Sequence, residues 1–109
     1  MDARLYDDVR EFTERIKDTP EYREYQEKKR IIEGYPELKE KAEELKKKNL
    51  EINSSFEDGR DTLEDLKKFA DEYQDVFMEP MINDYLAAES AFCRMMREIL
   101  TMTMERIDL

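Results

Sequence analysis

Histidine and tryptophan are absent from the 109 residues of this chain, and glycine, proline and cysteine occur only two, three and one times. The missing histidine removes the commonest general base and metal ligand. It also removes the Glu-x-x-His pairs from which helical bundles build di-iron sites. A single cysteine excludes an internal disulfide, and the two glycines form no phosphate-binding loop. The sequence therefore predicts no catalytic residue, no metal site and no cofactor.

Long apolar runs and isolated basic clusters are also missing. No stretch approaches the roughly 20 apolar residues that cross a bilayer, and the amino terminus lacks the residue order of a signal peptide. A formal charge of -10 would repel a phosphate backbone. The only basic run, Lys46-Lys47-Lys48, is interpreted as a solvated helix face. We expect a cytoplasmic protein that binds neither membranes nor, directly, nucleic acid.

What the chain does contain is typical of helices. Charged residues make up 44% of the sequence and hydrophobic residues 39%, which is too apolar for plain disorder. A chain this short forms one domain, residues 1–109, and buries a limited core alone. The composition therefore predicts an all-α domain whose helical bundle is completed by oligomerisation.

The prolines mark the helix boundaries, because proline is tolerated in the first turn of a helix and disruptive inside one. Thr19 precedes Pro20 as an N-cap, and Gly34 supplies a stop before Pro36. Pro80 opens the last segment. This division predicts four helices, over about residues 3–17, 20–33, 36–77 and 80–107.

The third segment has a heptad pattern from Leu38 to Phe77. One series consists of Leu38, Leu45, Ile52, Gly59, Leu66 and Tyr73, and the other of Ala42, Asn49, Phe56, Leu63, Ala70 and Phe77. Because both series stay in phase, we predict one continuous helix about 60 Å long, with a bend at Gly59 as the alternative. Asn49 is predicted to fix the register of helix pairing, although a solvent-facing side chain is an alternative.

The last segment is apolar on two sides, which predicts that a second chain covers part of it. We expect a homodimer or a higher assembly whose interface comprises Tyr85, Glu89, Phe92, Met95, Ile99, Met102 and Asn49. Glu89 interrupts one apolar ridge, so it either needs a buried partner such as an arginine or reaches solvent at the ridge edge. Cys93 is interpreted as an inert small hydrophobe.

Two other functional classes stay open. Five of the seven methionines lie between Met81 and Met104, and a methionine-rich face suits a small structural or chaperone-like protein that holds peptides. An enzyme whose acidic cluster recruits Mg²⁺ or Mn²⁺ is the third class, although solvated carboxylates explain the same pattern.

Two stretches of the sequence resemble the YlbF/YmcA-like family of small helical bacterial proteins. The first runs from Thr19-Pro20-Glu21-Tyr22 to Tyr35-Pro36-Glu37-Leu38, and the second is Glu79-Pro80-Met81-Ile82-Asn83-Asp84-Tyr85-Leu86-Ala87-Ala88-Glu89. The resemblance implies an all-helical, homo-oligomeric regulatory protein. In the branches that define the family's role, members act together in a complex that controls competence, sporulation and biofilm formation through RNA processing. Those branches carry several cysteines associated with iron–sulfur binding, whereas this chain has only Cys93.

Overall fold

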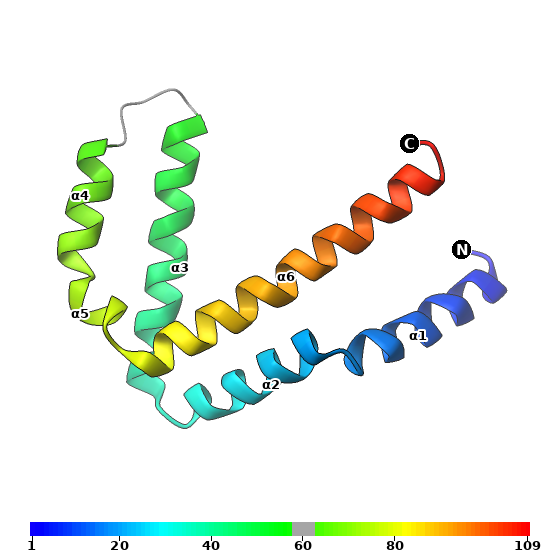
Figure 1. Cartoon of the computed structure of the whole chain (residues 1–109), viewed down its shortest axis with the longest axis horizontal. Helices are drawn as coiled ribbons and strands as arrows, with labels where there is room; N and C mark the ends of the chain where they lie inside the picture. The colour runs from blue at the N-terminus through cyan, green and yellow to red at the C-terminus, as the bar shows by residue number, and fades with distance from the viewer. Residues whose placement is uncertain (58–62) are drawn as a thin grey trace.

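The computed structural model describes residues 1–57 and 63–109. Within these ranges the chain forms helices and no strand (Figure 1). In chain order they are α1 (Ala3–Lys17), α2 (Pro20–Glu33), α3 (Pro36–Glu57), α4 (Leu63–Glu72), α5 (Gln74–Phe77) and α6 (Pro80–Arg106). The all-α class and the helix starts at the three prolines are confirmed.

Local capping explains where the helices begin. The Oδ1 atom of Asp2 accepts hydrogen bonds from the backbone N–H groups of Arg4 and Leu5, at 2.8 and 3.1 Å. Thr19 caps α2 by accepting from the N–H of Tyr22 at 3.3 Å. Each cap satisfies a donor that the first turn of a helix leaves without an intrahelical partner.

The prediction of one continuous helix over residues 36–77 is wrong. α3 ends at Glu57, and α4 begins at Leu63 and returns antiparallel beside it (Figure 1). The physical reason is burial, because Phe69 of α4 packs in one cluster with Leu45 and Ile52 of α3. A straight helix would have left these side chains uncovered within a single chain. The predicted alternative, a bend at Gly59, lies outside the described residues.

The heptad pattern describes α3 better than α4. Ala42, Leu45 and Ile52 are all buried, as a helix seam requires. On α4, however, the heptad residue Leu66 is 45% exposed, whereas Phe69, which belongs to neither series, is only 8% exposed. The buried face of α4 is therefore rotated away from the predicted seam.

The core lies where α2, α3 and α6 meet (Figure 1). Ile32 of α2 and Ile82 of α6 are fully buried there, next to Ala42 of α3. Full burial of one such isoleucine contributes roughly 1.5–3 kcal/mol. This junction fixes the directions in which the remaining parts of α2, α3 and α6 extend.

Two helical arms extend beyond the core. α1 has no buried residue, and the second half of α6 runs past the region covered by α3 to α5 (Figure 1). The molecule is consequently elongated, with extents of 51, 39 and 20 Å along its principal axes. Most of the exposed large apolar side chains of α1 and α6 lie on these arms.

Candidate interaction site

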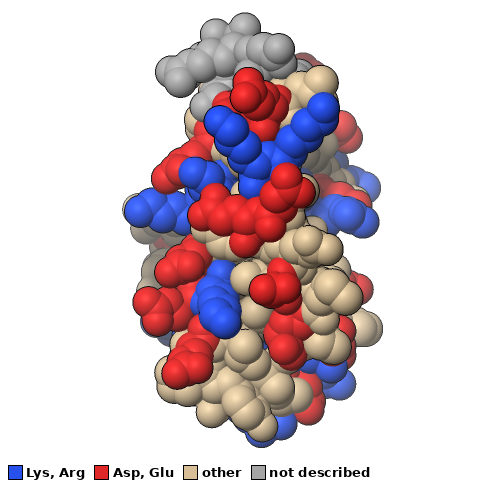
Figure 2. Space-filling model, turned by 90° about the vertical axis from the view of Figure 1, so that its left-hand side faces the viewer, with Lys and Arg blue, Asp and Glu red and all other residues tan. Residues whose placement is uncertain are grey.

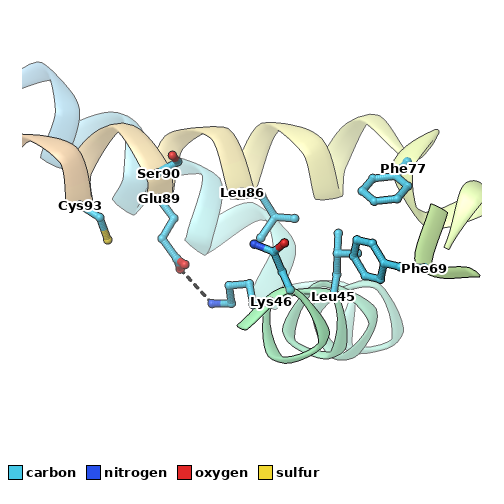
Figure 3. A pocket seen from close by; sticks show the side chains of 9 residues that line it. Leu45, Lys46, Phe69, Phe77, Leu86, Glu89, Ser90 and Cys93 are labelled. Atoms are coloured by element: carbon cyan, nitrogen blue, oxygen red, sulfur yellow. Dashed lines mark hydrogen bonds and ion pairs between the residues drawn. The ribbon is translucent and has the colours of Figure 1, made fainter. Parts of the chain in front are cut away.

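A polar cluster joins α3 to α6 near the core. The Nζ atom of Lys46 lies 3.0 Å from a carboxylate oxygen of Glu89 and 3.0 Å from one of Glu43 (Figure 3 shows the Glu89 pair). The hydroxyl of Tyr85 donates to Glu43 at 3.1 Å and accepts from Lys46 at 3.4 Å. Lys46 therefore connects two carboxylates that belong to different helices.

Burial and pairing decide the protonation of this cluster. Burial by itself would lower the pKa of Lys46, but its hydrogen bonds to Glu89 and Glu43 outweigh that effect and raise the pKa above its usual 10.5. Burial raises the pKa of Tyr85. Burial also opposes ionisation of Glu43, yet the hydrogen bonds from Lys46 and Tyr85 bring its pKa below 4.5. Both shifts favour the charged forms of Lys46 and Glu43 in this cluster.

Four aromatic side chains hold α2 against α6. The ring of Tyr25 stacks on that of Phe92 with a centroid distance of 5.4 Å and on that of Tyr85 at 6.3 Å. Tyr22 meets Phe92 edge to face at 5.7 Å. The spacing of Tyr22, Tyr25 and Ile32 places them on one face of α2, and this is the sequence signal that identifies α2 as a cover for α6.

The structure separates the residues predicted for a protein interface into two groups. Tyr85 is only 3% exposed, and Phe92 is half-buried against α2 of the same chain. Glu89 is half-buried, and its partner is Lys46 rather than an arginine. Asn49 is exposed and lies near Glu89 in the lining of a cavity. Glu89 and Asn49 thus lie at the junction of α3 and α6, whereas Tyr85 and Phe92 contact Tyr25 of α2.

The other predicted interface residues lie farther along α6. Met95 and Ile99 are half-buried, and Met102 is exposed. No contact with a second chain is described for any of the predicted residues, so their role in an interface stays a prediction.

A cavity of about 340 Å³ lies between α3, α4, α5 and α6 (Figure 3). Its apolar part is formed by Leu45, Phe69, Phe77 and Leu86, and its polar part by Lys46, Asn49, Glu89, Ser90 and Cys93. The sequence did not identify this cavity, because the reversal of the chain between α3 and α4 brings Phe69 and Phe77 to it. It combines an apolar wall with a polar edge, which suits an amphipathic helix.

The exposed apolar side chains form two further surfaces. On α1, Leu5 and Phe12 are 52% and 47% exposed, and on α6 Leu100 is 59% exposed. Both stretches are helical faces that no other part of the described chain buries. Contiguous apolar faces of this kind mark interaction surfaces more often than scattered single residues do.

The charged surface and the titratable side chains of the described ranges indicate no further site. On the side formed by α4 and α5, acidic and basic side chains are interspersed rather than gathered by sign (Figure 2). In the described ranges, no three acidic, histidine or cysteine side chains lie close enough to hold a metal ion. Nor does that part of the chain include a helix with the length and apolarity that a membrane span requires.

These features define the class of protein as a small all-helical protein with exposed apolar helix faces. The model of the family described as "Control of competence regulator ComK, YlbF/YmcA" matches residues 5–108. The chain therefore belongs to the YlbF/YmcA family, and the resemblance identified from its sequence motifs is confirmed. The description of the family is that of a regulator.

Two curated relatives match nearly the whole chain. A UPF0342 protein of Caldicellulosiruptor saccharolyticus is 27% identical over 106 residues, which cover 96% of this chain and 88% of the relative. A UPF0342 protein of Symbiobacterium thermophilum is 21% identical over 105 residues, or 95% and 94% of the two chains. No solved structure matches the chain significantly.

Proposed function

We propose that this chain is a non-enzymatic interaction protein that pairs with a second copy of itself and acts in a regulatory complex with related helical proteins. Membership of a family described by control of competence supports the regulatory part of this proposal. By the family resemblance, the regulated processes are competence, sporulation or biofilm formation, reached through RNA processing. The formal charge of -10 favours action through protein partners rather than by direct binding of RNA.

The observation that carries the proposal is the unpartnered apolar face of α1. Leu5, Val9 and Phe12 lie on one side of this helix, and each is about half exposed in the single chain. Covering the remaining apolar surface would contribute roughly 1 kcal/mol for each side chain. A second copy offers matching apolar surface on its own α1 and α6, so pairing would complete the helical bundle.

Light scattering coupled to size-exclusion chromatography, over a range of protein concentrations, tests this pairing. We expect a mass of two or more chains, and we expect Phe12→Glu to lower it to one. Ala3→Glu is the matched control. This substitution introduces the same charge, but Ala3 lies on the opposite side of α1. A wild-type monomer at every concentration would contradict the proposal.

The regulatory role needs a test in the bacterium that carries the gene. Deletion should change the ends and lifetimes of a set of transcripts, as measured by RNA sequencing after transcription is stopped. Wild-type protein and the Ala3→Glu variant should restore the pattern, whereas the Phe12→Glu variant should not. Restoration by a monomeric Phe12→Glu protein would separate regulation from self-association.

A chaperone-like function is the second candidate, and the exposed methionines of α6 support it. Met96, Met102 and Met104 are all exposed on the arm of α6. Methionine side chains repack easily around partners of different shape. Saturable binding of several unrelated apolar peptides would favour this candidate. If no such peptide binds, the partner-specific regulator is favoured instead.

A further inference from the structure

The apolar residues of α1 form a seam with the spacing of a coiled coil. The seam consists of Leu5, Val9, Phe12 and Ile16, which are four, three and four residues apart. At about 100° per residue, these side chains project within roughly 60° of one another. Alternating steps of four and three residues are those of the a and d positions through which paired helices meet. The seam is therefore suited to packing along a second helix.

No helix of the described ranges buries this seam. Leu5, Val9 and Phe12 are each about half exposed, and only Ile16, next to α2, is half-buried. α1 projects from the core as an arm (Figure 1), and α2 is the helix against which it mainly packs. A second helix can therefore lie along the seam without displacing α3 or the core.

The two flanks of the seam differ in charge. Asp8 and Arg15 lie on one flank, where they line one shallow hollow, and Tyr6 and Thr13 lie on the other, where they line a second hollow. At about 100° per residue, both pairs lie roughly 70–90° from the centre of the seam. In a symmetric antiparallel pair each flank faces the same flank of the other helix, whereas in a parallel pair it faces the opposite flank.

The charges favour the antiparallel orientation. It places Asp8 opposite Arg15 of the second copy, and the two-fold symmetry repeats this contact. A parallel pair would place Asp8 opposite the uncharged Thr13. Within the described ranges Asp8 forms no ion pair, and Arg15 has a 3.7 Å pair with the exposed Glu11. An exposed pair of that kind is weak, so Arg15 can turn to a second carboxylate.

The apolar residues and the charges select the same antiparallel register. One register pairs the whole seam, with Leu5 opposite Ile16 of the second copy and Val9 opposite Phe12 of the second copy. A shift of one heptad in either direction halves the number of apolar layers. Such a shift also brings either the two Asp8 carboxylates or the two Arg15 guanidinium groups together, and like charges that meet across an interface repel.

We infer that α1 packs antiparallel against α1 of a second copy, about a two-fold axis between Arg10 and Glu11, with Asp8 of each chain paired to Arg15 of the other. This inference rests on the proposed self-association and specifies its geometry. Symmetric pairing of one patch with itself is the usual arrangement of homodimers. The geometry differs from the interface predicted from the sequence, most of which lies on α6.

A charge exchange tests the predicted ion pairs. Asp8→Arg should raise the dissociation constant of the dimer about tenfold or more, because two cations would then meet at each of two equivalent places. Adding Arg15→Asp to the same chain should restore the dissociation constant to within about threefold of the wild type, because the pairs re-form with opposite polarity.

Asp7→Arg is the matched control, because it makes the same charge change on the opposite side of α1. It should alter the dissociation constant by less than about twofold. Light scattering over a range of concentrations measures the dimer. Asp7, Asp8 and Arg15 are all exposed, so circular dichroism should show the same helix content in every variant.

Cross-linking between two differently labelled chains tests the register on the other flank. In a Cys93→Ser background, chains with Tyr6→Cys are mixed with chains with Thr13→Cys and treated with a short bismaleimide. Mass spectrometry should show the mixed 6–13 product in excess of the 6–6 and 13–13 products, because these two positions face each other in the inferred register. Chains with Asp7→Cys and Glu14→Cys, mixed in the same way, have the same spacing on the outer side of α1 and report random collisions.

The outcomes separate this geometry from the proposed function. A stable dimer that Asp8→Arg and Asp7→Arg weaken equally would overturn the geometry and leave self-association standing. Failure of Arg15→Asp to rescue Asp8→Arg, or a mixed 6–13 product no more abundant than that of the outer cysteines, would overturn it as well. A wild-type protein that stays monomeric at every concentration would overturn both.

Discussion

The ammonium group of Lys46 on α3 lies 3.0 Å from the carboxylate of Glu89 on α6, although the two residues are separated by 43 positions in the sequence. Their side chains are 28% and 22% exposed, so solvent screens the pair only in part. The pair ties the α3–α5 part of the molecule to the long C-terminal helix. It also supplies the two charged side chains that line the cavity.

Removing this ammonium should destabilise the fold. Lys46→Met keeps the apolar stem but leaves the carboxylates of Glu43 and Glu89 facing each other without a cation. We expect a loss of about 1–2 kcal/mol in the free energy of unfolding, measured by urea titration at neutral pH. Lys47→Met is the control, because Lys47 is exposed, and it should change stability by less than about 0.5 kcal/mol. Equal effects of both substitutions would contradict a structural role for Lys46.

The raised pKa of Tyr85 predicts a loss of stability at alkaline pH. Above pH 10, its usual pKa, the unfolded chain releases the phenolic proton while the folded chain retains it. Ionisation then favours the unfolded state, so stability falls as the pH rises from 10 towards the folded-state pKa. Urea unfolding between pH 8 and pH 11 should show a steeper fall for the wild type than for Tyr85→Phe, which cannot ionise there. Parallel curves would contradict the prediction.

The antiparallel arrangement of α3 and α4 can be tested by comparing two apolar residues of α4. Phe69 is buried against α3, and its truncation to alanine should cost about 3 kcal/mol. Leu66 is 45% exposed, so its truncation to alanine should lower the free energy of unfolding by less than about 1 kcal/mol. A continuous heptad helix predicts the reverse order, since Leu66 would then occupy the seam. The urea midpoints of the two variants therefore decide between the arrangements.

Local signals explain the parts of the fold that the sequence predicted. The N-cap Thr19 and the prolines Pro20, Pro36 and Pro80 act on their immediate neighbours, so the helix starts are readable without tertiary information. The reversal between α3 and α4 is different, because it is stabilised by the packing of Phe69 against residues of α3 that are far away in the sequence. Heptad spacing could not reveal it, because the heptad series continues into α4 although the residue that α4 buries, Phe69, belongs to neither series.

The candidate site was predicted only in part for the same reason. Glu89 was identified as a carboxylate on an apolar ridge that needs a partner, and the structure supplies Lys46. The basic run that contains Lys46 reads as solvated surface, because a helical pattern does not show which of three lysines faces another helix. The aromatic cover from Tyr22 and Tyr25 likewise depends on how α2 docks onto α6.

Two of the predicted interface residues should differ in their effects on folding and on assembly. Phe92 stacks on Tyr25 and meets Tyr22, so Phe92→Glu would place a charge between α2 and α6 of one chain. We expect it to lower the free energy of unfolding by about 3 kcal/mol, measured by urea titration.

Met102 is exposed near the end of α6, so Met102→Glu should leave the helix content and stability of a single chain unchanged to within about 0.5 kcal/mol. If the arm of α6 joins the interface, this variant still weakens the dimer in light scattering, because a charge then enters an apolar contact. The two measurements together separate folding from assembly. An unchanged dimer with Met102→Glu would place the far end of α6 outside the interface, and a fully stable Phe92→Glu protein would show that the aromatic stack does not hold α2 in place.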